Sequence, residues 1–172
     1  RRRHTRFRNV TGVQTCALPI WEPRGAALLD VNVLVALFDA DHVHHDLAHD
    51  WFTDHREGGW ATCPITENGL IRVLANPKYG SALSAMGALV ERLRSFKASG
   101  HHVFWPDAVS ITEATTFTPG SIRGYRQLTD AYLLGLAHAN HGRLVTFDRS
   151  ISSSIVPKLP PVTLEILQAL ND

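Results

Sequence analysis

Four acidic residues recur at similar places in a pattern of apolar segments, and they are the main chemical signal in this sequence. Asp30 ends the apolar segment AALLD, and Asp148 ends the segment RLVTFD. Glu67 and Asp130 each lie in the first turn of an expected helix. Carboxylates that lie close together repel one another, and Mg²⁺ or Mn²⁺ relieves this repulsion by accepting oxygen ligands. Because such an ion can activate water and neutralise charge on a phosphodiester, the four acids predict a metal-dependent hydrolytic site.

Each of the four acids also has a purely structural explanation when it is considered alone. Asp30 could cap a helix, and Glu67 and Asp130 could complement a helix dipole. Asp148 could be a turn residue. We favour a shared site because all four are expected at one edge of a sheet. The sequence shows no Ser-His-Asp spacing, P-loop or Rossmann glycine pattern.

The expected elements alternate between strands and helices. Strands are expected at 26–30, 60–64, 102–106 and 143–148, with a short fifth at 162–167. Helices are expected at 31–40, 45–56, 65–77, 83–100 and 129–142, and a helix and loop at 107–127. Strands that are continuously apolar and separated by helices indicate a parallel sheet covered on both faces. In such a sheet the strand ends and the following helix starts share one edge, where ligands bind.

Residues 1–20 differ in character from the rest of the chain. They carry five arginines and no acid, and residues 10–20, VTGVQTCALPI, resemble the in-frame translation of a sequencing-adapter oligonucleotide. We therefore interpret 1–20 as a non-native, disordered segment fused upstream of a truncated gene. The alternative is a basic arm that binds nucleic acid. Without this segment, 12 of the 17 basic residues remain against all 16 acids, a net charge near −4.

Length and cysteine content place the rest of the chain in a broad class. A chain of 172 residues with 44% hydrophobic composition is typical of one globular domain. Outside residues 1–20, Cys63 is the only cysteine, which fits a reducing compartment, so we expect a cytoplasmic protein. No apolar run approaches the roughly 20 residues that span a bilayer. We therefore expect no membrane contact.

Four segments in order and spacing carry a resemblance to a known family. The segments are LLDVNVLVALFDADHVHH, TENGLIRVL, LTDAYLLGLA and LVTFDR. Over about residues 26–166 the chain resembles PIN-domain proteins, and more narrowly the VapC toxins of bacterial toxin–antitoxin pairs. The resemblance implies a three-layer α/β/α PIN-like domain with a central, mainly parallel sheet of four to five strands. It also implies an endoribonuclease that depends on Mg²⁺ or Mn²⁺.

The resemblance assigns roles to particular residues. It implies that Asp30, Glu67, Asp130 and Asp148 are catalytic, with Asp30 and Asp130 as the closest metal ligands. Glu67 and Asp148 would act partly through water. Positions that are polar in many relatives fall on Asn32 and Thr146, and we take these two and Arg149 as residues that support the site.

The implied partners are an RNA substrate and a cognate antitoxin that silences the enzyme, and we also expect a homodimer. Two other functions remain open. One is a nuclease of general RNA processing, or a nuclease directed at DNA, with the same site and no antitoxin. The other is a catalytically silent module that uses the fold for binding.

The segment DHVHHDLAH contains four histidines, His42, His44, His45 and His49. A zinc site needs three or four converging ligands, and neither an HExxH motif nor partner cysteines accompany them. We therefore expect them on a polar helix face, near the site or at a partner surface.

Aromatic and basic residues could contact RNA, but most have a simpler explanation. We expect the aromatic residues Trp51, Trp60, Phe104 and Trp105 in the core rather than stacked on bases. Six basic residues could contact phosphates, namely Arg72, Lys78, Arg123, Arg126, Arg143 and Arg149. We expect most of them to be solvated surface. For Arg149, beside Asp148, a phosphate contact and solvated surface both remain open. Cys63 is expected to be a small buried hydrophobic residue.

Overall fold

The structure is a computed structural model that describes residues 25–80 and 85–168. The predicted disorder of residues 1–20 therefore lies outside the described residues. No helix in the described ranges is both long and apolar enough to cross a bilayer.

A five-stranded sheet forms the centre of the molecule. Its strands are β1 (Ala27–Leu29), β2 (Trp60–Thr62), β3 (His102–Phe104), β4 (Arg143–Thr146) and β5 (Leu164–Ile166). They lie in the order β3-β2-β1-β4-β5, and every neighbouring pair is parallel. The prediction of a parallel sheet of four to five strands is confirmed. β1 occupies the centre, so its end is the most enclosed position along the sheet edge.

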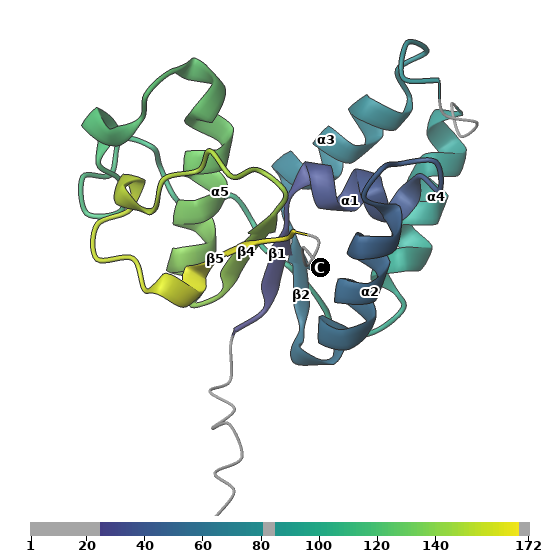
Figure 1. The fold of residues 1–172 in the computed structure, drawn as a ribbon, viewed down its shortest axis with the longest axis horizontal. Helices are drawn as coiled ribbons and strands as arrows, with labels where there is room; N and C mark the ends of the chain where they lie inside the picture. Colours follow the sequence, from purple (N-terminus) through teal and green to yellow (C-terminus); the bar gives the residue numbers. More distant parts are fainter. Residues whose placement is uncertain (1–24, 81–84, 169–172) are drawn as a thin grey trace, which may run out of the picture.

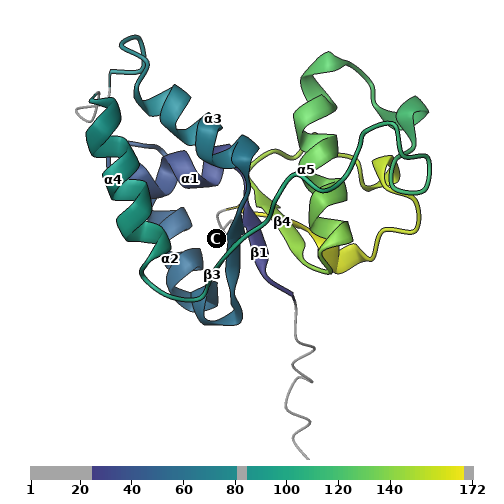
Figure 2. The ribbon, with the colours of Figure 1, turned by 180° about the vertical axis from the view of Figure 1, so that it is seen from behind.

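Helices cover both faces of the sheet, which gives the predicted three layers. The helices are α1 (Val31–Phe38), α2 (His45–His55), α3 (Pro64–Leu74), α4 (Met86–Lys97) and α5 (Leu128–Ala139). The first four lie on one side of the sheet and α5 lies on the other, as both views show (Figures 1 and 2). The separate hydrophobic clusters on the two faces agree with this arrangement.

The segment 107–127 contains no α-helix, so the prediction of a helix there was wrong. It runs in turns that include two 3₁₀ helices, Pro119–Ser121 and Tyr125–Gln127. Its threonines are β-branched, and Pro119 lacks a backbone donor, so an α-helix is disfavoured. The segment is anchored instead by Phe117, which is 1% exposed and packs so closely on α5 that Gly135 has no room for a Cβ.

Candidate active site

Asp30 lies between β1 and α1, at the carboxyl end of the central strand. Its side chain is 6% exposed, and its Oδ1 accepts a hydrogen bond of 2.6 Å from the Val31 N–H. Asp30 therefore caps α1, as its structural explanation requires. The carboxylate lies at the sheet edge while it caps the helix. Asp30 can therefore both cap α1 and serve as a predicted metal ligand.

Asn32 and Thr146 hold the other oxygen of Asp30. Asp30 Oδ2 accepts hydrogen bonds from Asn32 Nδ2 at 2.8 Å and from Thr146 Oγ1 at 2.7 Å. The Asn32 amide is itself fixed, because its Oδ1 accepts from the Phe147 N–H at 3.2 Å. A carboxylate has about four acceptor positions, and three of those on Asp30 are used. One position on Oδ1 remains for a further ligand.

Asp130 and Asp148 are coupled to Asp30 through their charges. Asp130 lies in the first turn of α5 and is half-buried. Burial, followed by the charges of Asp30 and Asp148, raises the pKa of Asp130 to about 6. Burial also raises the pKa of Asp30, against the hydrogen bonds from Thr146 and Val31, and Asp148 adds to this rise. The structure thus brings three of the four predicted acids into mutual repulsion at one edge.

Asp148 follows β4 and is oriented by its own turn. Its N–H donates to Thr146 Oγ1 at 3.0 Å, and its Oδ1 accepts from the Ser150 N–H at 2.7 Å. Arg149, between them, is exposed beside this carboxylate. Thr146 therefore connects Asp30 and Asp148 through one hydroxyl group.

Glu67 lies in the first turn of α3, where its contacts run to α4 and β2. Its Oε1 accepts from Thr62 Oγ1 at 2.6 Å and lies 2.6 Å from Lys97 Nζ. The Thr62 hydroxyl also lies 2.8 Å from Nε2 of His102. Burial and the other aspartates raise the pKa values of Asp30 and Asp130, and Glu67 is not among the causes. Glu67 is instead paired with Lys97. Lys97 was not predicted as a site residue.

Two of the four histidines, His45 and His49, have a structural role. Nδ1 of His45 lies 2.8 Å from the Ala36 carbonyl, and Nε2 of His49 lies 3.1 Å from the Leu37 carbonyl. These are carbonyls at the end of α1, which otherwise lack intrahelical partners. The prediction that these histidines lie on a polar helix face did not include the contacts of His45 and His49 with α1. His44 stacks on Phe147, next to Asp148, with ring centroids 4.5 Å apart.

The core assignment of the aromatic residues is confirmed for three of four. Trp51, Trp60 and Trp105 are buried, but Phe104 is 45% exposed. β3 is an edge strand, and the Phe104 ring lies 4.9 Å from Lys97 Nζ instead of under a helix. Cys63 is buried, as predicted.

One basic residue was also placed wrongly by the sequence. Arg143 is buried at 4% exposure and forms an ion pair of 2.8 Å with Glu165, because β4 is an interior strand beside β5. Arg123 and Arg126 are exposed, as expected. Tyr125, between Arg123 and Arg126, was not predicted as a functional residue, although the segment IRGYR lies just before the helix of Asp130.

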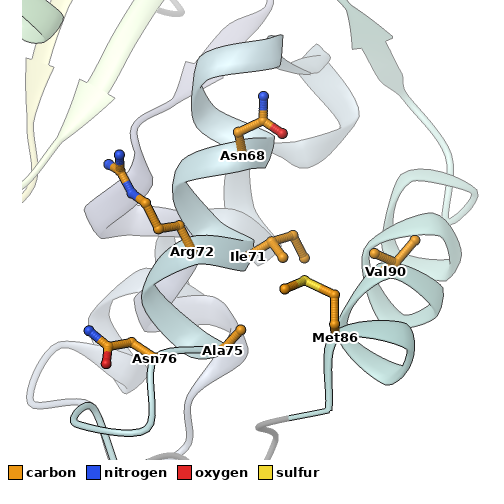
Figure 3. A pocket seen from close by; sticks show the side chains of 7 residues that line it. All are labelled: Asn68, Ile71, Arg72, Ala75, Asn76, Met86 and Val90. Atoms are coloured by element: carbon orange, nitrogen blue, oxygen red, sulfur yellow. The ribbon is translucent and has the colours of Figure 1, made fainter.

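A groove of about 680 Å³ between α3 and α4 does not coincide with the acids. Ile71, Met86 and Val90 point toward the space between the two helices (Figure 3). None of the four predicted acids lines it. The four predicted acids therefore lie outside this groove.

The aspartates suit a lightly coordinated metal better than a closed protein cage. In residues 25–80 and 85–168, no group of three or more His, Cys, Asp or Glu side chains is arranged to hold a metal ion. Mg²⁺ usually keeps several waters and binds one or two carboxylates. The open acceptor position of Asp30 and the charge repulsion at Asp130 fit such a pair.

Comparison with known proteins places this chain among relatives of one family. The PIN domain family matches residues 27–153. Ribonuclease VapC44 of Mycobacterium tuberculosis (strain ATCC 25618 / H37Rv) is 47% identical over 131 residues, which are 76% of this chain and 92% of the relative. Ribonuclease VapC38 of the same strain is 42% identical over 144 residues, 84% of this chain and 99% of the relative. Ribonuclease VapC39 is 39% identical over 128 residues, 74% and 92% of the two chains. The fold, the aspartates at its sheet edge and these matches together show that the chain belongs to the PIN-domain family, among its VapC-type members.

Proposed function

We propose that this chain is a metal-dependent endoribonuclease toxin of the VapC type, which hydrolyses RNA phosphodiester bonds. The observation that carries the proposal is the coupling of buried Asp30 to Asp130 and Asp148 at the sheet edge. Keeping three carboxylates there without a cation is unfavourable. The relatives at 39–47% identity are named ribonucleases, which supports RNA as the substrate.

Asp30 and Asp130 would hold the metal directly, with Glu67 and Asp148 acting through water. Mg²⁺ or Mn²⁺, when bound, would supply an activated water and neutralise charge on the phosphodiester. Asn32 and Thr146 keep Asp30 oriented through the hydrogen bonds to Oδ2.

The surrounding residues then have defined tasks. Thr62 and Lys97 fix Oε1 of Glu67, so its other oxygen is the one that can act on a water. Arg149 is exposed beside Asp148, where its guanidinium can contact a phosphate of the substrate.

Cleavage of a labelled single-stranded RNA by the purified protein tests the proposal. We expect cleavage with Mg²⁺ or Mn²⁺, none with a chelator, and recovery when metal is added back. Asp30→Asn should abolish cleavage while preserving the cap, since Asn caps helices about as well as Asp. Because the attacking group is a water, the products should carry no 2′,3′-cyclic phosphate. Chelator-resistant cleavage, or cleavage by Asp30→Asn at the parent rate, would exclude the proposal.

We further propose that a cognate antitoxin neutralises the protein in the bacterial cytoplasm and that the toxin is a homodimer. The net charge near −4 outside residues 1–20 suits a basic partner. Expression of the parent should inhibit bacterial growth, and Asp30→Asn should not. Normal growth despite abundant, folded and metal-loaded parent protein would contradict toxicity.

A further inference from the structure

Residues 122–127 form a basic border immediately before the helix of Asp130, and its central residues are exposed. Tyr125 is 83% exposed, and Arg123 and Arg126 are exposed on either side of it. No acidic residue occurs between positions 114 and 129. This border therefore differs in charge from the aspartates that it adjoins.

Hydrogen bonds of Gln127 join this border to the turn of Asp148. Gln127 Oε1 accepts from the Arg123 N–H at 3.0 Å, and its Nε2 donates to the Ser150 carbonyl at 3.3 Å. Ser150 in turn donates its N–H to Asp148. The border and the exposed Arg149 therefore flank the same acids, one from the start of α5 and the other from the end of β4.

The cationic groups of this region are available to a ligand. Within the part of the chain that the structure describes, no ion pair engages Arg123, Arg126 or Arg149. Arg126 contacts only a neutral neighbour here, with Nε 3.3 Å from the Tyr125 hydroxyl and its guanidinium carbon 5.8 Å from the ring centroid. By contrast, Arg94 and Lys97 each have a carboxylate partner.

We propose that Tyr125, Arg123, Arg126 and Arg149 form a subsite that binds single-stranded RNA beside the catalytic acids. Tyr125 stacks on one base, and the arginines contact the flanking phosphates. The strand is single because stacking on a side chain needs an unstacked base, which a duplex does not offer. The inference rests on the proposed ribonuclease function and adds how the substrate is held. Burial in the core does not explain an aromatic residue at this position, because Tyr125 is exposed.

Fluorescence anisotropy with a 5′-labelled, mixed-sequence single-stranded RNA tests the subsite, with the full chain in chelator so that no cleavage occurs. Tyr125→Ala should weaken binding by about tenfold, within the range measured for base stacking on aromatic residues. Tyr125→Phe and Tyr125→Trp should bind as the parent does, since the ring face is kept. Arg126→Ala should weaken binding and reduce the salt dependence by about 0.7 in the logarithmic slope.

Arg94→Ala is the control, because it also removes an exposed guanidinium, here on α4, and should leave binding unchanged. Parent-like binding by Tyr125→Ala, or an equal loss in Arg94→Ala, would overturn the subsite. So would a Tyr125→Ala variant that binds RNA normally but can no longer be neutralised by a co-expressed antitoxin, since that outcome assigns the surface to a protein.

Cleavage assays on the same proteins separate this inference from the proposed function. Tyr125→Ala should raise KM with little change in kcat, because the ring does not touch the reacting atoms. A parent that cleaves RNA with no dependence on Tyr125 refutes only the subsite. A parent that binds RNA through Tyr125 but never cleaves it refutes only the ribonuclease.

Discussion

At the scale of single residues, Asp30 shows why structural and chemical roles are hard to separate in this fold. The same carboxylate caps α1 through Oδ1 and accepts from Asn32 and Thr146 through Oδ2. The sequence predicted Asp30 at a strand end, and the resemblance to VapC toxins suggested Asn32 and Thr146 as residues that support the site. Asn32 is two residues from Asp30 in the sequence, whereas Thr146 is 116 residues away. Thr146 contacts Asp30 because β4 lies next to β1 in the sheet.

The raised pKa of Asp130 predicts a pH dependence of the metal-free protein. The folded state binds this proton more tightly than the unfolded state, whose Asp pKa is near 3.8. Its contribution is therefore most favourable below pH 4 and is lost as the pH rises through about 6. Asp130→Asn should remove this dependence, so its melting temperature relative to the parent should increase between pH 4 and pH 7 in chelator.

Melting curves of both proteins over that pH range give the difference directly. A constant difference between parent and Asp130→Asn would show that the folded state does not raise the pKa of Asp130. Mg²⁺ at pH 7 should then reduce the advantage of the variant, because the ion relieves the same repulsion in the parent.

Lys97 was not predicted because it is 30 residues from Glu67 in the sequence. Their contact depends on how α3 and α4 pack. If Glu67 serves the metal through water, the metal must compete with Lys97 for that carboxylate. Lys97→Met should therefore increase the affinity for Mn²⁺ by several-fold, since a positive charge near the cation is removed. Lys97→Arg should resemble the parent.

A Glu67→Gln background distinguishes competition for Glu67 from a general effect of losing the Lys97 charge. In a Glu67→Gln background, Lys97→Met should no longer increase the affinity, because the competed carboxylate is gone. Weaker Mn²⁺ binding by Lys97→Met in the parent background would show instead that Lys97 holds Glu67 ready for the metal. Metal titrations monitored by thermal unfolding measure the affinity of all five proteins, namely the parent, Lys97→Met, Lys97→Arg, Glu67→Gln and the double variant.

At the scale of elements, the position of α1 depends on its contacts at both ends. Its last carbonyls meet His45, His49 and Arg92, the last of which donates Nη1 to the Phe38 carbonyl at 2.6 Å. Near its start, Val31 packs against Gly69 of α3 so closely that a Cβ there would lie 2.5 Å from Val31 Cγ2. Residues that seem remote from the chemistry therefore fix the direction of Asp30.

Gly69→Ala and Gly87→Ala should change stability in opposite directions, although both place alanine in a helix. At Gly69 the methyl group meets a β-branched side chain with one preferred rotamer, so we expect a loss of about 1–3 kcal/mol. At Gly87 in α4 the added Cβ would meet no side chain or other element within 4 Å among the described residues, so we expect a gain of up to about 1 kcal/mol.

Chemical denaturation of both variants measures these changes. Gly69→Ala should also reduce cleavage more than its stability loss explains, because Val31 adjoins Asp30. Equal stabilisation by the two substitutions would show that α1 and α3 are packed less closely than described.

At the scale of the whole molecule, the sequence predicted the layers and the parallel sheet because the strands are apolar throughout and separated by helices. It failed where local pattern and tertiary context disagree. Phe104 resembles a core residue, but its strand forms the edge of the sheet. Arg143 resembles a surface residue, but β4 lies inside the sheet and Glu165 compensates its charge. Strand order decides both positions, and no local pattern in the sequence encodes it.

The central claim is that Asp30 and Asp130 together hold a divalent metal at the sheet edge, and calorimetric titration of Mn²⁺ into chelator-stripped protein tests it most directly. The parent should bind the ion and, near pH 6, release protons, because Asp130 is about half protonated there. Asp30→Asn should bind at least about tenfold more weakly. Asp50→Asn removes the same charge from an exposed position on α2 and should bind as the parent does. Equal Mn²⁺ affinity in all three proteins, or no binding by the parent, would contradict the account.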